Sequence, residues 1–216
     1  KDTDLPHMLP DVKSWEDIVS NMGIKNNDQI VIYDNSDVIS SCRCWYNFIY
    51  FGHNPELVHV LDGGLKKWTE EYKPTTNEII SVTPYSYTVN EKKDLVKDIK
   101  QINKNIFENK FSVIDARSLE RFEGKVTEPR KGLRSGSIKN SFCLPFSKLI
   151  NKDHTFINKE KIYEMFKSTG YEMDKNIVFT CGSGVTASVL ALAYSLIDNK
   201  YMPTIYDGSW SEYGKN

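Results

Sequence analysis

The chain of 216 residues has few of the features that mark nucleic-acid-binding, membrane-spanning or disulfide-rich proteins. Its 28 basic and 29 acidic residues give a formal net charge of −1 and are interspersed, so the charge indicates neither a nucleic acid nor a membrane surface as partner. The longest apolar stretch, Val185 to Ile197, is interrupted by polar residues and is too short to span a bilayer. A hydrophobic content of 39% and a charged content of 26% are those of an ordinary globular protein.

Cysteine is scarce as well. Four cysteines in a chain of this length do not form a disulfide framework, which favours a reducing, cytoplasmic setting. Cys42 and Cys44 flank Arg43, but they lie in the aromatic-rich helical run Ser40–Phe51, and no histidine pair has the spacing of zinc ligands. We therefore predict that these two thiols are structural, and we expect neither a metal nor an organic cofactor.

The strongest chemical signal surrounds Cys181. The apolar run Ile177–Thr180 predicts a strand, residues Gly182–Thr186 predict a tight loop, and Ala187–Leu196 predicts a helix. Two glycines let the backbone curl around the sulfur, so that N–H groups and the positive end of the helix meet there. Because both effects favour a thiolate, we predict that Cys181 is a nucleophile rather than a small buried hydrophobic residue.

Two classes of cysteine enzyme use a loop of this type. Cysteine phosphatases carry an arginine six residues after the cysteine to clamp the phosphate, but that position is Ala187 here, and no arginine follows Cys181. Sulfurtransferases instead carry a sulfur atom on the cysteine as a persulfide. The run Cys181-Gly182-Ser183-Gly184-Val185-Thr186 closely resembles the active loop of the 3-mercaptopyruvate sulfurtransferases of the rhodanese family. Members selective for thiosulfate typically have basic residues directly after the cysteine. Because Gly182 and Ser183 stand there, the resemblance favours mercaptopyruvate as the sulfur donor.

An internal repeat determines the predicted fold. Ile30–Asp34 parallels Ile177–Cys181, and Val60–Trp68 parallels Ile205–Tyr213 at nearly the same offset. Each copy is typical of strand, loop, helix, strand, Asp-Gly turn and helix. This order predicts an α/β fold of tandem rhodanese-like domains, each a parallel sheet flanked by helices. Asp34 stands where the second copy has Cys181, and because a carboxylate cannot carry sulfur, we predict that the first copy is catalytically silent.

The repeat also predicts the domain boundaries. Residues 1–75 are expected to form a partial, silent rhodanese-like domain, residues 76–95 an interdomain linker without clear periodicity, and residues 96–216 the catalytic domain. The run Phe111–Arg117 reads as a strand that ends in Asp-x-Arg, and it resembles the opening strand of rhodanese domains. Its counterpart in the first copy would lie before Lys1. We therefore expect the first domain to be N-terminally incomplete and the intact gene product to carry a further segment there.

The resemblance also implies the residues that bind the substrate. The family places two substrate-binding arginines in an Arg-Phe-x-Gly…Glu-Pro-Arg segment, which corresponds here to Arg121 and Arg130. Two such cationic side chains suit the carboxylate of mercaptopyruvate. Composition alone would instead favour surface arginines paired with neighbouring glutamates. Arg117, close to the start of the domain, is predicted to be structural. The loop residues Gly182, Gly184, Val185 and Thr186 complete the expected substrate site.

His7 is implied by the resemblance alone. It lies in the tetrapeptide His-Met-Leu-Pro, which in the mercaptopyruvate enzymes supplies a histidine that reaches across the domain interface toward the loop serine, here Ser183. The family's partner aspartate for this histidine lies further upstream, in the segment that precedes Lys1.

These observations predict a sulfurtransferase that moves sulfur from 3-mercaptopyruvate through a Cys181 persulfide to an acceptor, releasing pyruvate. The acceptor is expected to be a small thiol, thioredoxin or cyanide. Two alternatives stay open: a thiosulfate sulfurtransferase with the same persulfide, and a non-enzymatic persulfide relay or scaffold protein. We expect a cytoplasmic monomer with no nucleic-acid or membrane partner.

Overall fold

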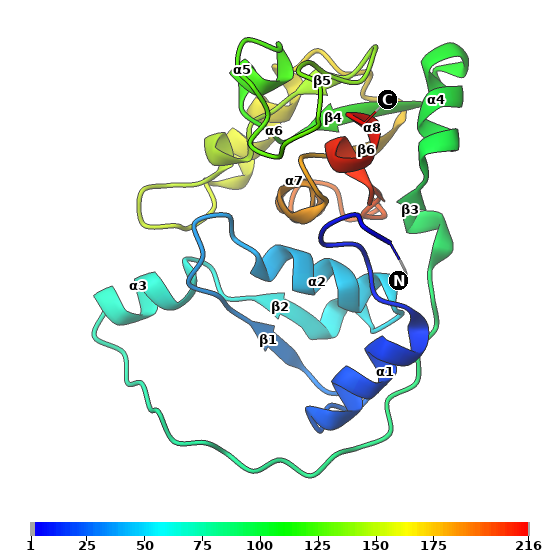
Figure 1. Ribbon diagram of the computed structural model, residues 1–216. Coiled ribbons are helices and arrows are strands. Elements are labelled where there is room, and N and C mark those ends of the chain that lie inside the picture. The colour runs from blue at the N-terminus through cyan, green and yellow to red at the C-terminus, as the bar shows by residue number, and fades with distance from the viewer. Residues whose placement is uncertain (1–2, 216) are drawn as a thin grey trace.

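The computed structural model describes residues 3–215 as two α/β units, one above the other in Figure 1, joined by an irregular segment. Lys1, Asp2 and Asn216 belong to the predicted domain ranges but lie outside the described residues. Within residues 3–215, no helix is long and apolar enough to cross a membrane.

The first unit is built on a two-stranded parallel sheet, in which Ile30 pairs with Val58 and Ile32 with Val60. Helix α2 covers one face of this sheet, and most of its side chains are buried, including Trp45, Tyr46 and Phe48. The elements of this unit are α1 (Val12–Asn21), β1 (Ile30–Ile32), α2 (Ser41–Tyr50), the 3₁₀ turn η1 (Pro55–Leu57), β2 (Val58–Val60) and α3 (Gly64–Glu70).

The segment predicted as a linker has no helix or strand before Lys93. Residues 71–86 are exposed, and Figure 1 shows them as a long arc that stands away from the helices. From Tyr85 onward the chain is attached to the first unit, because Tyr85 N–H donates to Ser20 O, and Asn90 N–H donates to Phe51 O. The last part of the expected linker therefore packs as part of the first unit.

The second unit has a five-stranded parallel sheet in the order β3-β7-β6-β4-β5. Asp115 at the end of β4 lies opposite Thr180 at the end of β6, so the residues that follow each strand emerge at the same edge. The strands are β3 (Val96–Lys97), β4 (Phe111–Asp115), β5 (Phe142–Cys143), β6 (Asn176–Thr180) and β7 (Ile205–Tyr206). The helices and 3₁₀ turns are η2 (Lys93–Leu95), α4 (Ile99–Glu108), α5 (Leu119–Phe122), η3 (Phe146–Leu149), α6 (Lys159–Lys167), α7 (Val185–Ser195) and α8 (Ser209–Tyr213). The prediction of parallel sheets flanked by helices is confirmed.

Helix α7 lies where the two units meet. Its sequence is apolar on nearly every face, as expected for a helix that is enclosed by protein. It packs between its own sheet and α2 of the first unit (Figure 1). Apolar side chains of both units form one continuous cluster, which includes Trp45 and Phe48 from α2 and Ala187 and Leu190 from α7. This packing brings Arg43, near the start of α2, within hydrogen-bonding reach of Gly184, directly before α7.

Candidate active site

Cys181 lies between the end of β6 and the start of α7, and its side chain is buried. Two backbone N–H groups point at its sulfur, from Gly184 at 3.1 Å and from Ser183 at 3.5 Å. Together with the N-terminus of α7, an 11-residue helix, these groups stabilise negative charge on the sulfur. The loop therefore has the geometry that the strand–loop–helix pattern predicts.

The other three thiols lie in different surroundings. Burial raises the pKa of Cys44 to about 11 and that of Cys143 to about 12, and it also raises the pKa of fully buried Cys42. These side chains stay protonated at neutral pH and are poor nucleophiles. All four cysteines are free thiols.

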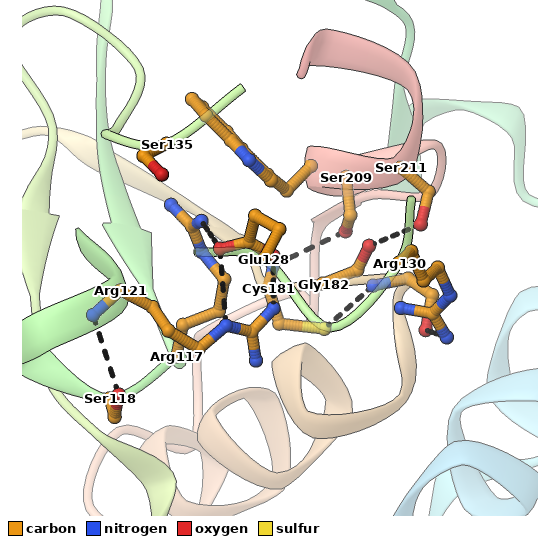
Figure 2. Close-up of polar contacts among 12 residues, drawn as sticks. Arg117, Ser118, Arg121, Glu128, Arg130, Ser135, Cys181, Gly182, Ser209 and Ser211 are labelled. Carbon is orange, nitrogen blue, oxygen red and sulfur yellow. Dashed lines mark hydrogen bonds and ion pairs between the residues drawn. The ribbon is translucent and has the colours of Figure 1, made fainter. Parts of the chain in front are cut away.

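Helix α8 holds the loop from the side opposite the sulfur (Figure 2). Trp210 N–H donates to Cys181 O at 2.9 Å, and Ser211 donates to Gly182 O from both its N–H, at 2.9 Å, and its hydroxyl, at 2.6 Å. Ser209 Oγ accepts the N–H of Cys181 at 3.2 Å. Because these contacts turn the two carbonyls toward α8, the next N–H groups in the loop are free to face the sulfur.

Gly184 is the tightest point of the loop. Its φ is +85°, and a Cβ there would lie 3.0 Å from Arg43 Nη1 and 3.2 Å from Asp207 O. Gly132 also has a positive φ, of +80°, but a Cβ there would meet nothing within 4 Å. An alanine at either position would adopt a strained positive φ, but only an alanine at Gly184 would also collide with its neighbours. Comparing the two substitutions therefore separates the free-energy cost of the backbone strain from that of the collision.

We expect Gly184→Ala to lower the free energy of unfolding by about 2–4 kcal/mol, from left-handed strain plus overpacking. Gly132→Ala should lower the free energy of unfolding by only about 1 kcal/mol, because it adds backbone strain without a collision. Urea denaturation of both variants measures the difference. Equal losses would mean that the neighbours of Gly184 move aside and that close packing does not shape the loop.

The two predicted arginines converge over Gly182. A Cβ at this position would lie 3.3 Å from Arg121 Nη2 and 3.4 Å from Arg130 Nη1, so only glycine leaves both guanidinium groups their present place. Arg130 is exposed, and its hydrogen bond within residues 3–215 is from Nη2 to Ser183 Oγ, at 3.3 Å. The structure thus brings the guanidinium groups of Arg121 and Arg130 to the loop that carries Cys181 (Figure 2).

Glu128, which the sequence suggested only as one of the neighbouring glutamates that could pair with surface arginines, holds Arg121 in place. Its carboxylate binds Arg121 through Nε at 3.1 Å and Nη2 at 2.5 Å. The same carboxylate, whose side chain is buried, accepts Nη1 of Arg117 at 2.8 Å. Arg121 is therefore paired with a glutamate, as composition alone suggested, and it also lies against the Cys181 loop, as the resemblance implied.

Arg117 is buried below this pair. It binds Asp115 and Gly136 O, and its guanidinium lies 4.3 Å from the centre of the Trp210 ring. Burial alone would lower the pKa of Arg117, but Asp115 and Glu128 outweigh it and the pKa is raised. The side chain links β4, Glu128 and α8, as a structural residue does.

His7 reaches the loop from the first unit. Its Nδ1 lies 2.9 Å from Ser183 Oγ, and its backbone has a φ of 60°. Burial, followed by the positive charges of Arg130 and Arg43, lowers the pKa of His7 below its usual 6.5. His7 is therefore neutral at neutral pH and can accept a proton from the serine hydroxyl or, as the other tautomer, donate one to it.

Val185 and Thr186, the last two predicted loop residues, form the first turn of α7 and are half-buried. Within residues 3–215 their side chains make no hydrogen bond, so their contribution to the site is shape. In the same described part of the chain, no group of three or more histidine, cysteine and carboxylate side chains could hold a metal ion.

Comparison with known proteins places this arrangement among sulfurtransferases. The family model described as "Rhodanese-like domain" matches residues 4–71 and 98–216. The chain is 35% identical to thiosulfate/3-mercaptopyruvate sulfurtransferase 1, mitochondrial, of Arabidopsis thaliana, over 98% of the chain and 60% of the relative. It is 34% identical to the 3-mercaptopyruvate sulfurtransferase of Mus musculus, over 96% of the chain and 69% of the relative. The chain thus spans well under the full length of both.

The fold has similar solved structures. The crystal structure of SseA from Escherichia coli, titled as one of the 3-mercaptopyruvate sulfotransferases, superposes with a TM-score of 0.84 at 28% identity. The match covers 97% of this chain and 77% of that structure. The similarity therefore extends over both units.

Proposed function

The chain belongs to the rhodanese-like family, whose relatives named above are sulfurtransferases, and we propose that it transfers sulfur from 3-mercaptopyruvate to an acceptor through a persulfide on Cys181. The observation that carries this proposal is the loop itself. A cysteine sulfur faces two N–H groups, while two guanidinium groups lie beside the next residue, Gly182. A carboxylate held by the arginines would place a thiol two carbons away close to the sulfur of Cys181.

The proposed reaction needs no cofactor. The Cys181 thiolate attacks the thiol sulfur of mercaptopyruvate, an S–S bond forms, and the C–S bond breaks with its electron pair moving into the enolate of pyruvate. The former thiol proton leaves the persulfide and is delivered to the enolate, which becomes pyruvate. The persulfide is left as an anion, so protons and charge balance. N–H groups that face the sulfur stabilise its charge before and after the transfer.

We propose that Ser183 and His7 transfer the proton that the enolate takes up. Ser183 Oγ lies within hydrogen-bonding distance of both His7 Nδ1 and Arg130 Nη2, on the part of the loop where the ketone would be bound. The hydroxyl can polarise the ketone, and neutral His7 can accept the proton given up by the persulfide and return it to the enolate through the hydroxyl.

The second step removes the outer sulfur. We propose a thiol acceptor, either a small thiol or a protein such as thioredoxin, with cyanide as an alternative acceptor in the assay. The attacking thiolate or cyanide bonds to the outer sulfur, and the S–S electron pair returns to Cys181. Four free thiols suit a reducing compartment such as the cytoplasm, and we propose that the protein works there as a monomer.

Thiosulfate is the second candidate donor. The cationic pair above Gly182 would attract a dianion as well as a carboxylate, and the Arabidopsis relative is named for both donors. Residues Gly182 and Ser183 add no further positive charge, which favours the monoanionic mercaptopyruvate.

Steady-state kinetics with both donors test the proposal. We expect kcat/KM for 3-mercaptopyruvate to exceed that for thiosulfate by at least about tenfold, since the Ser183 hydroxyl can stabilise the charge that develops on the ketone oxygen as the enolate forms. The reverse preference would make the protein a thiosulfate sulfurtransferase. Turnover of neither donor, with a persulfide acquired only from another protein, would indicate a relay.

The lowered pKa of His7 predicts the pH dependence of turnover. Because neutral His7 is the form that accepts the proton, kcat for mercaptopyruvate should hold its plateau below pH 6.5 and fall only at more acidic pH. A kcat–pH profile between about pH 4.5 and 8 measures this limb. The fall in kcat at acidic pH should be absent in His7→Ala. A fall centred above pH 6.5 would contradict the role of His7 as the proton acceptor.

A further inference from the structure

Arg43 is a buried cation in helix α2 of the silent unit, most of whose other side chains are apolar or aromatic. Its guanidinium crosses to the catalytic unit, where Nη2 binds Asp207 Oδ1 at 2.6 Å. The side chains of Arg43 and Asp207 are only 10% and 2% exposed, so water does little to weaken this pair. Nη1 of Arg43 also lies 3.4 Å from Gly184 O in the catalytic loop.

The two partners of this ion pair also form hydrogen bonds to the backbone at and after His7. Arg43 Nη2 donates to His7 O at 2.9 Å, and the N–H of Leu9 donates to Asp207 Oδ2 at 2.9 Å. The chain is thus fixed directly after the His7 side chain and again two residues later. His7 has a φ of 60°, a conformation that a residue with a Cβ keeps only where its surroundings enforce it.

We propose that Arg43 is a positioning residue through which the silent unit holds His7 against Ser183. The inference rests on the proposed function, in which the His7–Ser183 pair moves the proton. Arg43 touches neither the sulfur nor the arginines above Gly182. The charged groups that face His7 are Arg130 from the loop after α5 and Arg43 from α2, and Asp207 faces Arg43.

A second ion pair between the units supplies a control. Lys67 of α3 binds Asp153 of the catalytic unit at 2.7 Å, and neither residue bonds to His7. This pair is about one-third exposed, so its loss weakens the attachment between the units only slightly and leaves the contacts of His7 in place. If Arg43 positions His7, the two losses should differ at His7 and in turnover.

The test uses Arg43→Lys, which keeps the positive charge but ends one bond short of Nη2, the atom that binds both Asp207 Oδ1 and His7 O. We expect kcat for mercaptopyruvate to fall by about 10–100-fold with KM changed by less than about threefold, as for loss of a proton-transfer group. Asp207→Asn, which weakens the same grip from the other side, should act in the same direction and serves if Arg43→Lys folds poorly. Lys67→Gln should leave kcat unchanged.

Coupling to His7 separates positioning from simple attachment. In a His7→Ala background, Arg43→Lys should lower kcat by less than about threefold further, because its effect acts through the side chain already removed. Independent, multiplying losses would overturn the proposal.

A second measurement does not depend on turnover. Diethyl pyrocarbonate modification, followed by mass spectrometry, reports how freely each histidine reacts. His7 should react several-fold faster in Arg43→Lys than in the wild type or in Lys67→Gln, with His53, His59 and His154 as internal references. An unchanged rate at His7 would overturn the positioning role. Wild-type protein that fails to turn over mercaptopyruvate would instead overturn the proposed function, and the labelling would still decide the role of Arg43.

Discussion

Cys181→Ser is expected to abolish both sulfur loading and turnover, reducing kcat by at least roughly four orders of magnitude. The serine hydroxyl would occupy the same loop, but it neither ionises at neutral pH nor carries sulfur as a persulfide does. The measurement is intact mass spectrometry after incubation with 3-mercaptopyruvate. Wild-type protein should gain one sulfur atom, which a thiol then removes, and the variant should gain none.

The remaining cysteines are the matched controls. Cys42→Ser, Cys44→Ser and Cys143→Ser should each load sulfur like the wild type, because burial keeps these thiols protonated. Sulfur found on Cys143 or Cys42 at the level of Cys181 would show that the loop is not the carrier.

Arg130→Ala and Arg121→Ala are each expected to lower kcat/KM for mercaptopyruvate by an amount equivalent to about 2–4 kcal/mol of transition-state stabilisation, as for loss of a charged hydrogen bond to the bound substrate. Both guanidinium groups lie against Gly182, where the carboxylate of the substrate would be held. Arg121→Ala also leaves one side of buried Glu128 unpaired, so it should lower thermal stability, whereas Arg130→Ala should not.

Lysine replacements refine this prediction. Arg130→Lys should recover only part of the lost kcat/KM, since an ammonium group lacks the planar fork that matches a carboxylate. Initial rates over a range of mercaptopyruvate concentrations give the comparison. Wild-type kinetics in both alanine variants would assign the two arginines to surface ion pairing instead.

The loop could be predicted because its determinants are local. A β-branched run, two glycines and a following helix are adjacent in sequence, and together they determine where the Cys181 sulfur and the N–H groups lie. The repeat similarly predicted two α/β units, because strand and helix periods are read within short windows. The resemblance supplied Arg121 and Arg130, and the fold then placed both over Gly182.

The residues that support the loop could not be predicted in this way. Glu128 was seen only as a surface partner, although it is buried and shared by two arginines. The pairing of Arg43 with Asp207 joins residues far apart in sequence and arises only when α2 packs on α7. A weak signal was present, since an arginine inside an aromatic-rich helical run calls for a buried partner, but the sequence does not name that partner.

The apolar cluster shared by α2 and α7 has a consequence for how the two copies of the repeat can diverge. A silent duplicate is ordinarily free to accumulate substitutions, because no chemistry selects against them. Here Trp45 and Phe48 of the first copy pack in the same cluster as Ala187 and Leu190, which lie in the helix directly after the Cys181 loop. A substitution that opens a cavity in the first copy would therefore also weaken the packing of the second copy. On the proposal that the first copy is catalytically silent, substitutions on the face of α2 that packs against α7 would still disturb the loop that carries Cys181.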